Sequence, residues 1–189
     1  MPGHPNEAFS TSAPTSGLIT SADIPRDIPV FRTASVLLSS AARAGYQRLV
    51  EKLTADGGLE TLDKISICYM GADFKPLLLV SGDSANVQTT VLAPNKAYTA
   101  ILLARDTVDV GPRMRELHVA PPSYGNDRIT DFAGGVRIWR QDVGTIGGVG
   151  VSGLDPLADH KLALVARDLI LEPYPEFESF SKPGFYEEI

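Results

Sequence analysis

The sequence predicts an α+β domain in which an antiparallel sheet carries helices packed on it. Two stretches, residues 65–80 and 132–151, each contain a pair of apolar segments around a short turn, which is typical of a β-hairpin. Segments with helical spacing precede, separate and follow these two stretches. Hairpins that alternate with helices favour an antiparallel sheet over the parallel sheet of an α/β fold.

The length and composition indicate one globular domain with an arm at each end. The chain has 189 residues, of which 43% are hydrophobic and 21% charged, close to globular averages. Residues 1–30 are rich in Pro, Ser and Thr and bury too little to offset their ordering entropy, so we expect a flexible arm. Residues 173–189 predict a tail that docks on a surface, because aromatic side chains bury much area. Its aromatic residues include Phe177, Phe180, Phe185 and Tyr186. The domain itself is expected over residues 31–172.

The first helix is expected over residues 32–56, followed by the first hairpin. Apolar positions recur at spacings of three and four residues and line one helix face. These positions are Leu38, Ala42, Gly45, Leu49 and Leu53. Gly57 and Gly58 end the helix. Strands at residues 65–70 and 76–80 then enclose a Gly-Ala-Asp turn.

A second helix is expected within residues 87–105. Pro94 either interrupts it or begins its second half. Residues 106–131 contain several prolines and predict a long loop, and loops of that length in a compact domain are often functional.

The second hairpin and the last helix complete the domain. Strands are expected at residues 132–139 and 144–151. The last helix begins at Asp155 and Pro156, since Asp is a favoured N-cap and Pro a favoured first helical residue. Its predicted apolar face consists of Ala158, Leu162, Val165 and Leu169.

Residues 148–153 fit the G-x-G-x-x-G pattern of dinucleotide-binding sites, but the context argues against that function. The pattern normally opens a parallel βαβ unit, and no clear second strand follows before Pro173. Asp155 at the helix start would also repel a phosphate. We therefore expect a strand whose glycines let a helix, another subunit or a flat ligand come close.

Charge and cysteine content restrict the partners and the compartment. The net charge is −6 and the pI is near 5.0, which argues against nucleic acid and anionic membranes as partners. The single cysteine, Cys68, lies between apolar residues and is expected in the core. We find no secretory signal and no apolar run long enough to span a membrane, so we expect a cytoplasmic protein.

Three stretches together resemble the GlcG/HbpS-like family, which includes the C-terminal domain of PduO-type proteins. They are the Lys-Ala-Tyr-Thr-Ala stretch at residues 96–100, the Phe-Ala-Gly-Gly stretch within 132–138, and the glycine-rich stretch at 144–153. Asp159 follows in the next helix. The resemblance covers about residues 32–170.

The resemblance implies a profilin-like fold, assembly into homo-oligomers and a small-molecule site. Members of the family are associated with haem binding or degradation, so the implied ligand is haem or another tetrapyrrole, and otherwise no cofactor is expected. The sequence departs from the family at Pro94 and in the turn of the first hairpin. No metal ligand can be carried over to a position in this chain.

The candidate site residues begin with the long loop and the second helix. His118 is a candidate haem ligand or acid/base group, or else a surface histidine, and Tyr124 lies near it as a ligand contact. Lys96 is a candidate catalytic amine that meets a carboxylate or forms a Schiff base, or else a solvated lysine. Tyr98 and Thr99 are candidate hydrogen-bond donors, with a packing role as the alternative for Tyr98.

The other candidates surround the second hairpin. Arg137 is placed either as a carboxylate clamp among the catalytic residues or in an outward salt bridge. Phe132, Gly134 and Gly135 are candidate ligand-binding positions, and the two glycines are also suited to close backbone approach. His160 lies in the first turn of the last helix, where the helix dipole disfavours its charged form.

Three functions remain open at this point. The first is a small-molecule-binding domain of the GlcG/HbpS type in a homo-oligomer, with a pocket where the second helix, the Phe-Ala-Gly-Gly strand and the long loop meet. The second is a cofactor-independent lyase, isomerase or cyclase that uses acid/base catalysis on a small metabolite. The third is a structural or regulatory subunit without chemistry.

Overall fold

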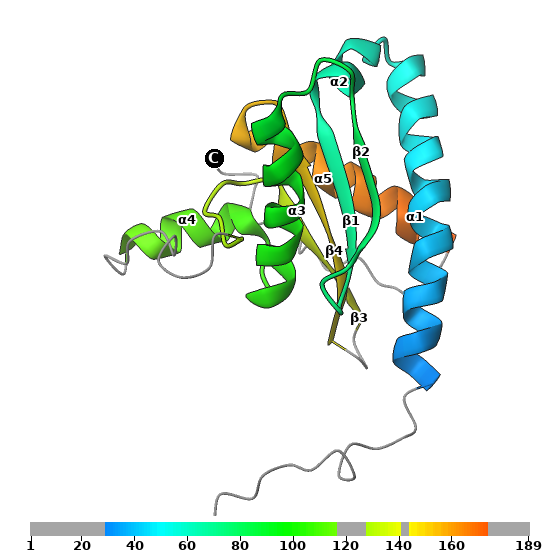
Figure 1. The fold of residues 1–189 in the computed structure, drawn as a ribbon, viewed down its shortest axis with the longest axis vertical. Helices are drawn as coiled ribbons and strands as arrows, with labels where there is room; N and C mark the ends of the chain where they lie inside the picture. Colours follow the sequence, from blue (N-terminus) through cyan, green and yellow to red (C-terminus); the bar gives the residue numbers. More distant parts are fainter. Residues whose placement is uncertain (1–28, 117–127, 141–143, 174–189) are drawn as a thin grey trace, which may run out of the picture.

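The fold is a four-stranded antiparallel sheet with helices on both of its faces (Figure 1). The computed structural model describes residues 29–116, 128–140 and 144–173. The elements are α1 (Pro29–Ala55), α2 (Leu59–Lys64), β1 (Ser66–Gly71), β2 (Pro76–Ser81), α3 (Val87–Leu102), α4 (Thr107–Glu116), β3 (Gly135–Arg140), β4 (Gly144–Ser152) and α5 (Pro156–Leu171). This arrangement confirms the predicted α+β class and its antiparallel hairpins.

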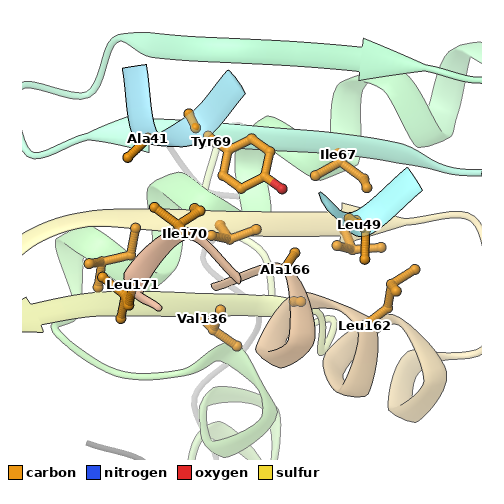
Figure 2. Close-up of a cluster of buried hydrophobic side chains, with 14 of the residues drawn as sticks. Ala41, Leu49, Ile67, Tyr69, Val136, Leu162, Ala166, Ile170 and Leu171 are labelled. Atoms are coloured by element: carbon orange, nitrogen blue, oxygen red, sulfur yellow. The ribbon is translucent and has the colours of Figure 1, made fainter. Parts of the chain in front are cut away.

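The strand order β2-β1-β4-β3 joins the two hairpins through β1 and β4 at the centre of the sheet. All six residues of β1 are buried, because helices cover both of its faces. Ile67 and Tyr69 pack into the larger core with α1 and α5, as Figure 2 shows. Cys68 and Met70 point to the other face and pack under α3, which confirms the core position expected for Cys68.

Helix α3 approaches the sheet so closely because β4 carries glycines beneath it. A Cβ atom at Gly148 would lie 3.0 Å from the Ala97 carbonyl oxygen, and one at Gly150 would overlap the Ala93 carbonyl oxygen. The glycine-rich stretch is therefore a packing surface for a helix. Since β4 pairs antiparallel with both neighbours, the parallel βαβ unit that a dinucleotide site needs is not formed here.

Helices α1 and α5 cross on the opposite face of the sheet. Gly45 lies at the crossing, where a Cβ atom would come within 2.8 Å of the Ile170 side chain. The predicted apolar face of α1 is confirmed, with Leu38, Ala42 and Leu49 almost fully buried.

The predicted start of α5 is confirmed, and its predicted apolar face is confirmed in part: Leu162 is buried, while Val165 and Leu169 are partly buried against the core. The Asp155 carboxylate accepts hydrogen bonds from the Leu157 and Ala158 backbone amides as an N-cap. The most deeply buried apolar positions of the helix are Ala163, Ala166, Ile170, Leu171 and Leu162. The buried surface of α5 is wider than predicted, because it also includes Asp159, His160 and Arg167, which a hydrophobic pattern places outside.

Other predicted elements differ from the structure near residues 102–135. The predicted loop at 106–131 contains α4, although Gly111 and Pro112 lie inside this helix. Gly111 is needed there because a Cβ atom would lie 2.8 Å from the Asp131 carbonyl oxygen. Strand β3 begins at Gly135 instead of residue 132, and α3 runs through Pro94 without a break. In this region, tertiary packing outweighs the tendency of proline and glycine to interrupt helices.

The short helix α2 was not predicted from the sequence. It has six residues, none of them buried, so it offers no apolar period to detect. Within the described part of the chain, no helix is long and apolar enough to cross a membrane.

Candidate functional site

Lys96 forms a buried ion pair with Asp159 between α3 and α5. The Lys96 Nζ atom lies 2.6 Å from Asp159 Oδ2 and donates a second hydrogen bond, of 2.9 Å, to the Val151 carbonyl oxygen. Each of the two charged side chains is only 3% exposed. The pair joins the helix on one face of the sheet to the first turn of the helix on the other face.

Burial and pairing act in opposite directions on these two groups. Burial lowers the pKa of Lys96 and raises the pKa of Asp159, while their mutual attraction opposes both shifts. Asp159 Oδ1 accepts a hydrogen bond from the Leu154 backbone amide, so the carboxylate also holds the turn after β4. The alternative of a solvated Lys96 is wrong, and the carboxylate that its amine meets belongs to the protein itself. Its catalytic role stays a prediction.

Thr99 on α3 holds residues 128–132, the segment that precedes β3, by a hydrogen bond. Its side chain is fully buried, and its hydroxyl oxygen accepts a hydrogen bond of 3.0 Å from the Thr130 backbone amide. The same hydroxyl donates to the Asn95 carbonyl oxygen at 2.8 Å. Thr99 therefore positions residues 128–132 beside the second half of α3.

Tyr98 on α3 contacts a cationic side chain, Arg128 of this segment, and an aromatic one, Phe74. The Arg128 guanidinium carbon is 4.1 Å from the centroid of the Tyr98 ring, a cation–π geometry. The Phe74 ring packs against Tyr98 with its centroid 4.9 Å away. Four residues after Arg128, Phe132 is 52% exposed. We call Phe74, Tyr98 and Arg128 the Tyr98 site.

Gly134 and Gly135 lie against α3 and are both buried. Gly134 has φ +114, and a Cβ atom there would lie 2.8 Å from the Asp159 Cβ atom. A Cβ atom at Gly135 would overlap the Lys96 carbonyl oxygen. The space beside both glycines is thus occupied by the protein, and their ligand-binding role stays a prediction.

Arg137 is engaged by the turn that follows α3. Its guanidinium donates a hydrogen bond of 2.7 Å to the Ala104 carbonyl oxygen and lies 6.0 Å from the centroid of the Trp139 ring. Its backbone amide donates to the Asp106 carboxylate at 3.0 Å. Burial raises the pKa of Asp106, while this backbone hydrogen bond and the nearby arginines oppose the shift. The predicted use of Arg137 as a clamp stays a prediction.

His160 is buried in α5, with 4% of its surface exposed. Burial lowers the pKa of His160 to about 4. Asp109 on α4 favours the charged imidazole, and Arg167 on α5 disfavours it. His160 is therefore neutral in the folded protein at pH 7.

We expect His160 to make the fold less stable as the pH falls from about 6.5 to about 4. The imidazole has a pKa near 6.5 in the unfolded chain and about 4 in the folded chain, so acid favours the unfolded state. Its stabilising contribution is complete above pH 6.5 and falls by about 3 kcal/mol as the pH approaches 4.

Urea unfolding of the wild type and of His160→Gln across this pH range measures the effect. The difference between their free energies of unfolding cancels the titration of the carboxylates that both proteins share. A difference that stays constant from pH 7 to pH 4 would contradict a buried neutral imidazole.

The structure brings some of the predicted site residues together and leaves others outside the described residues. Lys96, Tyr98 and Thr99 lie on α3, next to the segment that carries Phe132 and the two glycines. His118 and Tyr124 lie outside the described residues. Among the residues that the structure describes, no three His, Cys, Asp or Glu side chains gather as a metal site. Burial raises the pKa of Cys68 to about 12, so this thiol is not a nucleophile at neutral pH.

Sequence reasoning missed the partners of the predicted residues. Asp159 was noted within the family motif but not as the partner of Lys96, since 63 residues separate them. Neither Arg128 nor Phe74 was among the predicted site residues. Phe74 has φ +61, a rare conformation that the hairpin turn imposes and that no sequence pattern signals.

The chain is similar to known proteins in sequence and in fold. A family model described as haem degrading protein HbpS-like matches residues 39–168. No curated protein matches the chain.

Among solved structures, the Klebsiella pneumoniae protein ORFY is 25% identical to this chain. The match has a TM-score of 0.60 and covers 70% of this chain and 88% of ORFY. A double mutant of HbpS from Streptomyces reticuli is 22% identical, with a TM-score of 0.57 and coverage of 69% and 84%. A complex of PduOC with haem is 22% identical, with a TM-score of 0.53 and coverage of 72% and 91%. The family match spans more than half of the 189 residues, and the chain belongs to the HbpS-like family.

Proposed function

We propose that this protein binds haem or a closely related tetrapyrrole at the Tyr98 site and acts as a homo-oligomer. The family match to HbpS-like haem-degrading proteins supports the ligand class, as does the similarity to a PduOC structure that contains haem. The observation that carries the proposal is the Arg128 guanidinium stacked on Tyr98 beside Phe74. The single cysteine, which cannot form an internal disulfide, supports a cytoplasmic location.

The Tyr98 site fits the chemistry of a flat ligand that carries carboxylates. Aromatic rings stack on a planar macrocycle, and a guanidinium forms charge-assisted hydrogen bonds with a carboxylate such as a propionate. Arg128 is exposed, and Phe132 on the same segment adds an accessible aromatic surface. In this proposal Tyr98, Phe74 and Phe132 contact the ring, while Arg128 orients it by one carboxylate.

Bound haem would supply an iron centre for ligand binding or redox chemistry. In the described part of the chain, the amine of Lys96 and the imidazole of His160 are both buried, so neither faces a ligand at the surface. His118 precedes Arg128 by ten residues in the sequence, and in this proposal its imidazole would hold the iron of bound haem.

Titration of the purified full chain with hemin tests this proposal. We expect a shifted Soret band that saturates at one hemin per chain, and a Kd raised about tenfold in Arg128→Ala, the loss of one charge-assisted interaction. Arg43→Ala on the exposed surface of α1 is the matched control and keeps the wild-type Kd. His118→Ala is expected to change the position of the Soret band.

The outcomes separate the ligand from its site. No spectral change in the wild type would overturn haem as the ligand. Wild-type binding by Arg128→Ala would overturn the Tyr98 site while leaving haem as the ligand.

A further inference from the structure

The Tyr98 site combines aromatic and positively charged side chains on one surface. The Phe74 ring packs with its centroid 4.9 Å from that of Tyr98, and the Arg128 guanidinium carbon lies 4.1 Å from the Tyr98 centroid. Arg128 is exposed, Phe132 on the same segment is 52% exposed, and Phe74 is only partly buried. Aromatic rings pack on such rings, and a carboxylate pairs with the guanidinium. A peptide that carries rings next to carboxylates therefore suits this surface as well as a tetrapyrrole does.

The chain carries that combination in its own last residues. Residues 174–189 lie outside the described residues and beyond the family match, which ends at residue 168. Within them, Phe185 and Tyr186 are followed directly by Glu187 and Glu188. The segment holds four glutamates and one lysine, so its net charge of −3 is half of the net charge of −6 of the whole chain. Its charge is opposite to that of Arg128, and its rings gain from leaving water.

The segment starts on the opposite face of the sheet, where α5 ends beside α1. Ile170 packs at Gly45 of α1, where a Cβ atom would lie 2.8 Å from the Ile170 side chain. Leu38 lies seven residues before Gly45, which is about 10 Å along the helix axis. A Cβ atom at Gly147 of β4 would lie 3.6 Å from the Leu38 side chain. The end of α5 is therefore about two helical turns from the end of the sheet at Gly147.

This end of the sheet is the one that carries the Tyr98 site. Gly147 pairs with Gly71, where the hairpin turn that contains Phe74 begins. Twelve residues, 174–185, span up to about 40 Å when extended. That length allows the chain to pass from α5 around the end of the sheet, since packed layers are about 10 Å apart. Residues 174–179 span only about 20 Å, so the last residues of the segment can reach the site and the first ones cannot.

We propose that residues 185–188 of the same chain occupy the Tyr98 site when haem is absent, with the Tyr186 ring on Tyr98 and the Glu187 carboxylate on Arg128. This inference rests on the Tyr98 site of the proposed function and not on haem as its ligand. An entering ligand then has to displace the segment, which lowers its apparent affinity. The segment thereby favours ligands that offer both a ring and a carboxylate.

Titration of the full chain with hemin tests the competition. Tyr186→Ala with Glu187→Gln is expected to lower the Kd for hemin about threefold to tenfold, because a tethered competitor acts at an effective concentration near the millimolar range. Phe177→Ala with Glu178→Gln is the matched control and keeps the wild-type Kd, since it removes the same kinds of side chain too close to α5 to reach the site. An unchanged Kd in the first variant, or an equal decrease in both, would overturn the docking.

A disulfide test reports the docked segment without hemin. Phe132→Cys with Tyr186→Cys is expected to form a disulfide within one chain under mild oxidation, identified by mass spectrometry after digestion. Cys68 is buried and does not compete. Val87→Cys with Tyr186→Cys is the control that stays reduced, because Val87 is 81% exposed but lies at the other end of α3 from the site.

The outcomes separate this inference from the proposed function. The Phe132–residue 186 disulfide without any binding of hemin would support the docking and overturn haem as the ligand. Binding of hemin without this disulfide would overturn the docking and leave the proposed function in place. Disulfides between two chains instead of within one would overturn the same-chain arrangement.

Discussion

Lys96→Met is expected to lower the free energy of unfolding by about 3–5 kcal/mol, because it leaves the Asp159 carboxylate buried without its partner. The two side chains are each 3% exposed, so water cannot replace the lost ammonium without opening the contact between α3 and α5. Urea unfolding followed by circular dichroism at pH 7 measures the change. Asp159→Asn is expected to destabilise the protein in the same direction.

Two further variants isolate the cause. Lys96→Met combined with Asp159→Leu is expected to recover much of the loss, since replacing a whole buried pair by apolar groups is often close to neutral. Lys52→Met breaks the exposed pair with Asp56 and is expected to cost less than about 1 kcal/mol. A loss for Lys96→Met as small as that for Lys52→Met would show that the pair does not hold the two helices together.

Gly150→Ala is expected to lower the free energy of unfolding by about 3 kcal/mol or more, because the new methyl group has no space beneath α3. The Cβ atom would overlap the Ala93 carbonyl oxygen and lie 2.7 Å from the Ala97 backbone nitrogen. Backbone atoms of a helix cannot rotate away, so α3 must move off the sheet. Urea unfolding measures the loss.

Two other glycines provide a graded control. A Cβ atom at Gly148 would lie 3.0 Å from its nearest atoms, so Gly148→Ala is expected to cost less than Gly150→Ala. At Gly71 the nearest atom is Asp73 Oδ1, at the end of a side chain that can turn away, so Gly71→Ala is expected to cost least. Any other order of the three losses would contradict close packing of α3 on β4.

The elements that the sequence predicted correctly are those with local signals. The apolar spacing of α1 and the Asp-Pro start of α5 depend on residues within a few turns of one another. The two hairpins depend on short apolar segments around turns, and together they were enough to predict an antiparallel sheet. Helix α4 was missed because Gly111 and Pro112 are residue types typical of loops. Gly111 is required by the close contact with Asp131, which is twenty residues away in the sequence and therefore gives no local signal.

The candidate site was predicted only in part, for a related reason. The Lys-Ala-Tyr-Thr-Ala stretch directed attention to Lys96, Tyr98 and Thr99, and all three take part in specific contacts. What each residue contacts was not predicted, because Asp159, Arg128 and Thr130 are distant in the sequence. From the sequence alone, Lys96 could be either a solvated lysine or an amine paired with a carboxylate, and only its contact with Asp159 distinguishes the two.

The sequence by itself determined the α+β class, the family resemblance and a glycine-rich strand suited to close approach, because these depend on spacing and residue type along the chain. Only the tertiary structure decided that Lys96 pairs with Asp159, that Arg128 stacks on Tyr98 and that α3 packs on the glycines of β4. These properties depend on which segments meet across the sheet. Burial then sets whether a charge is paired or solvated, and no local pattern encodes that choice.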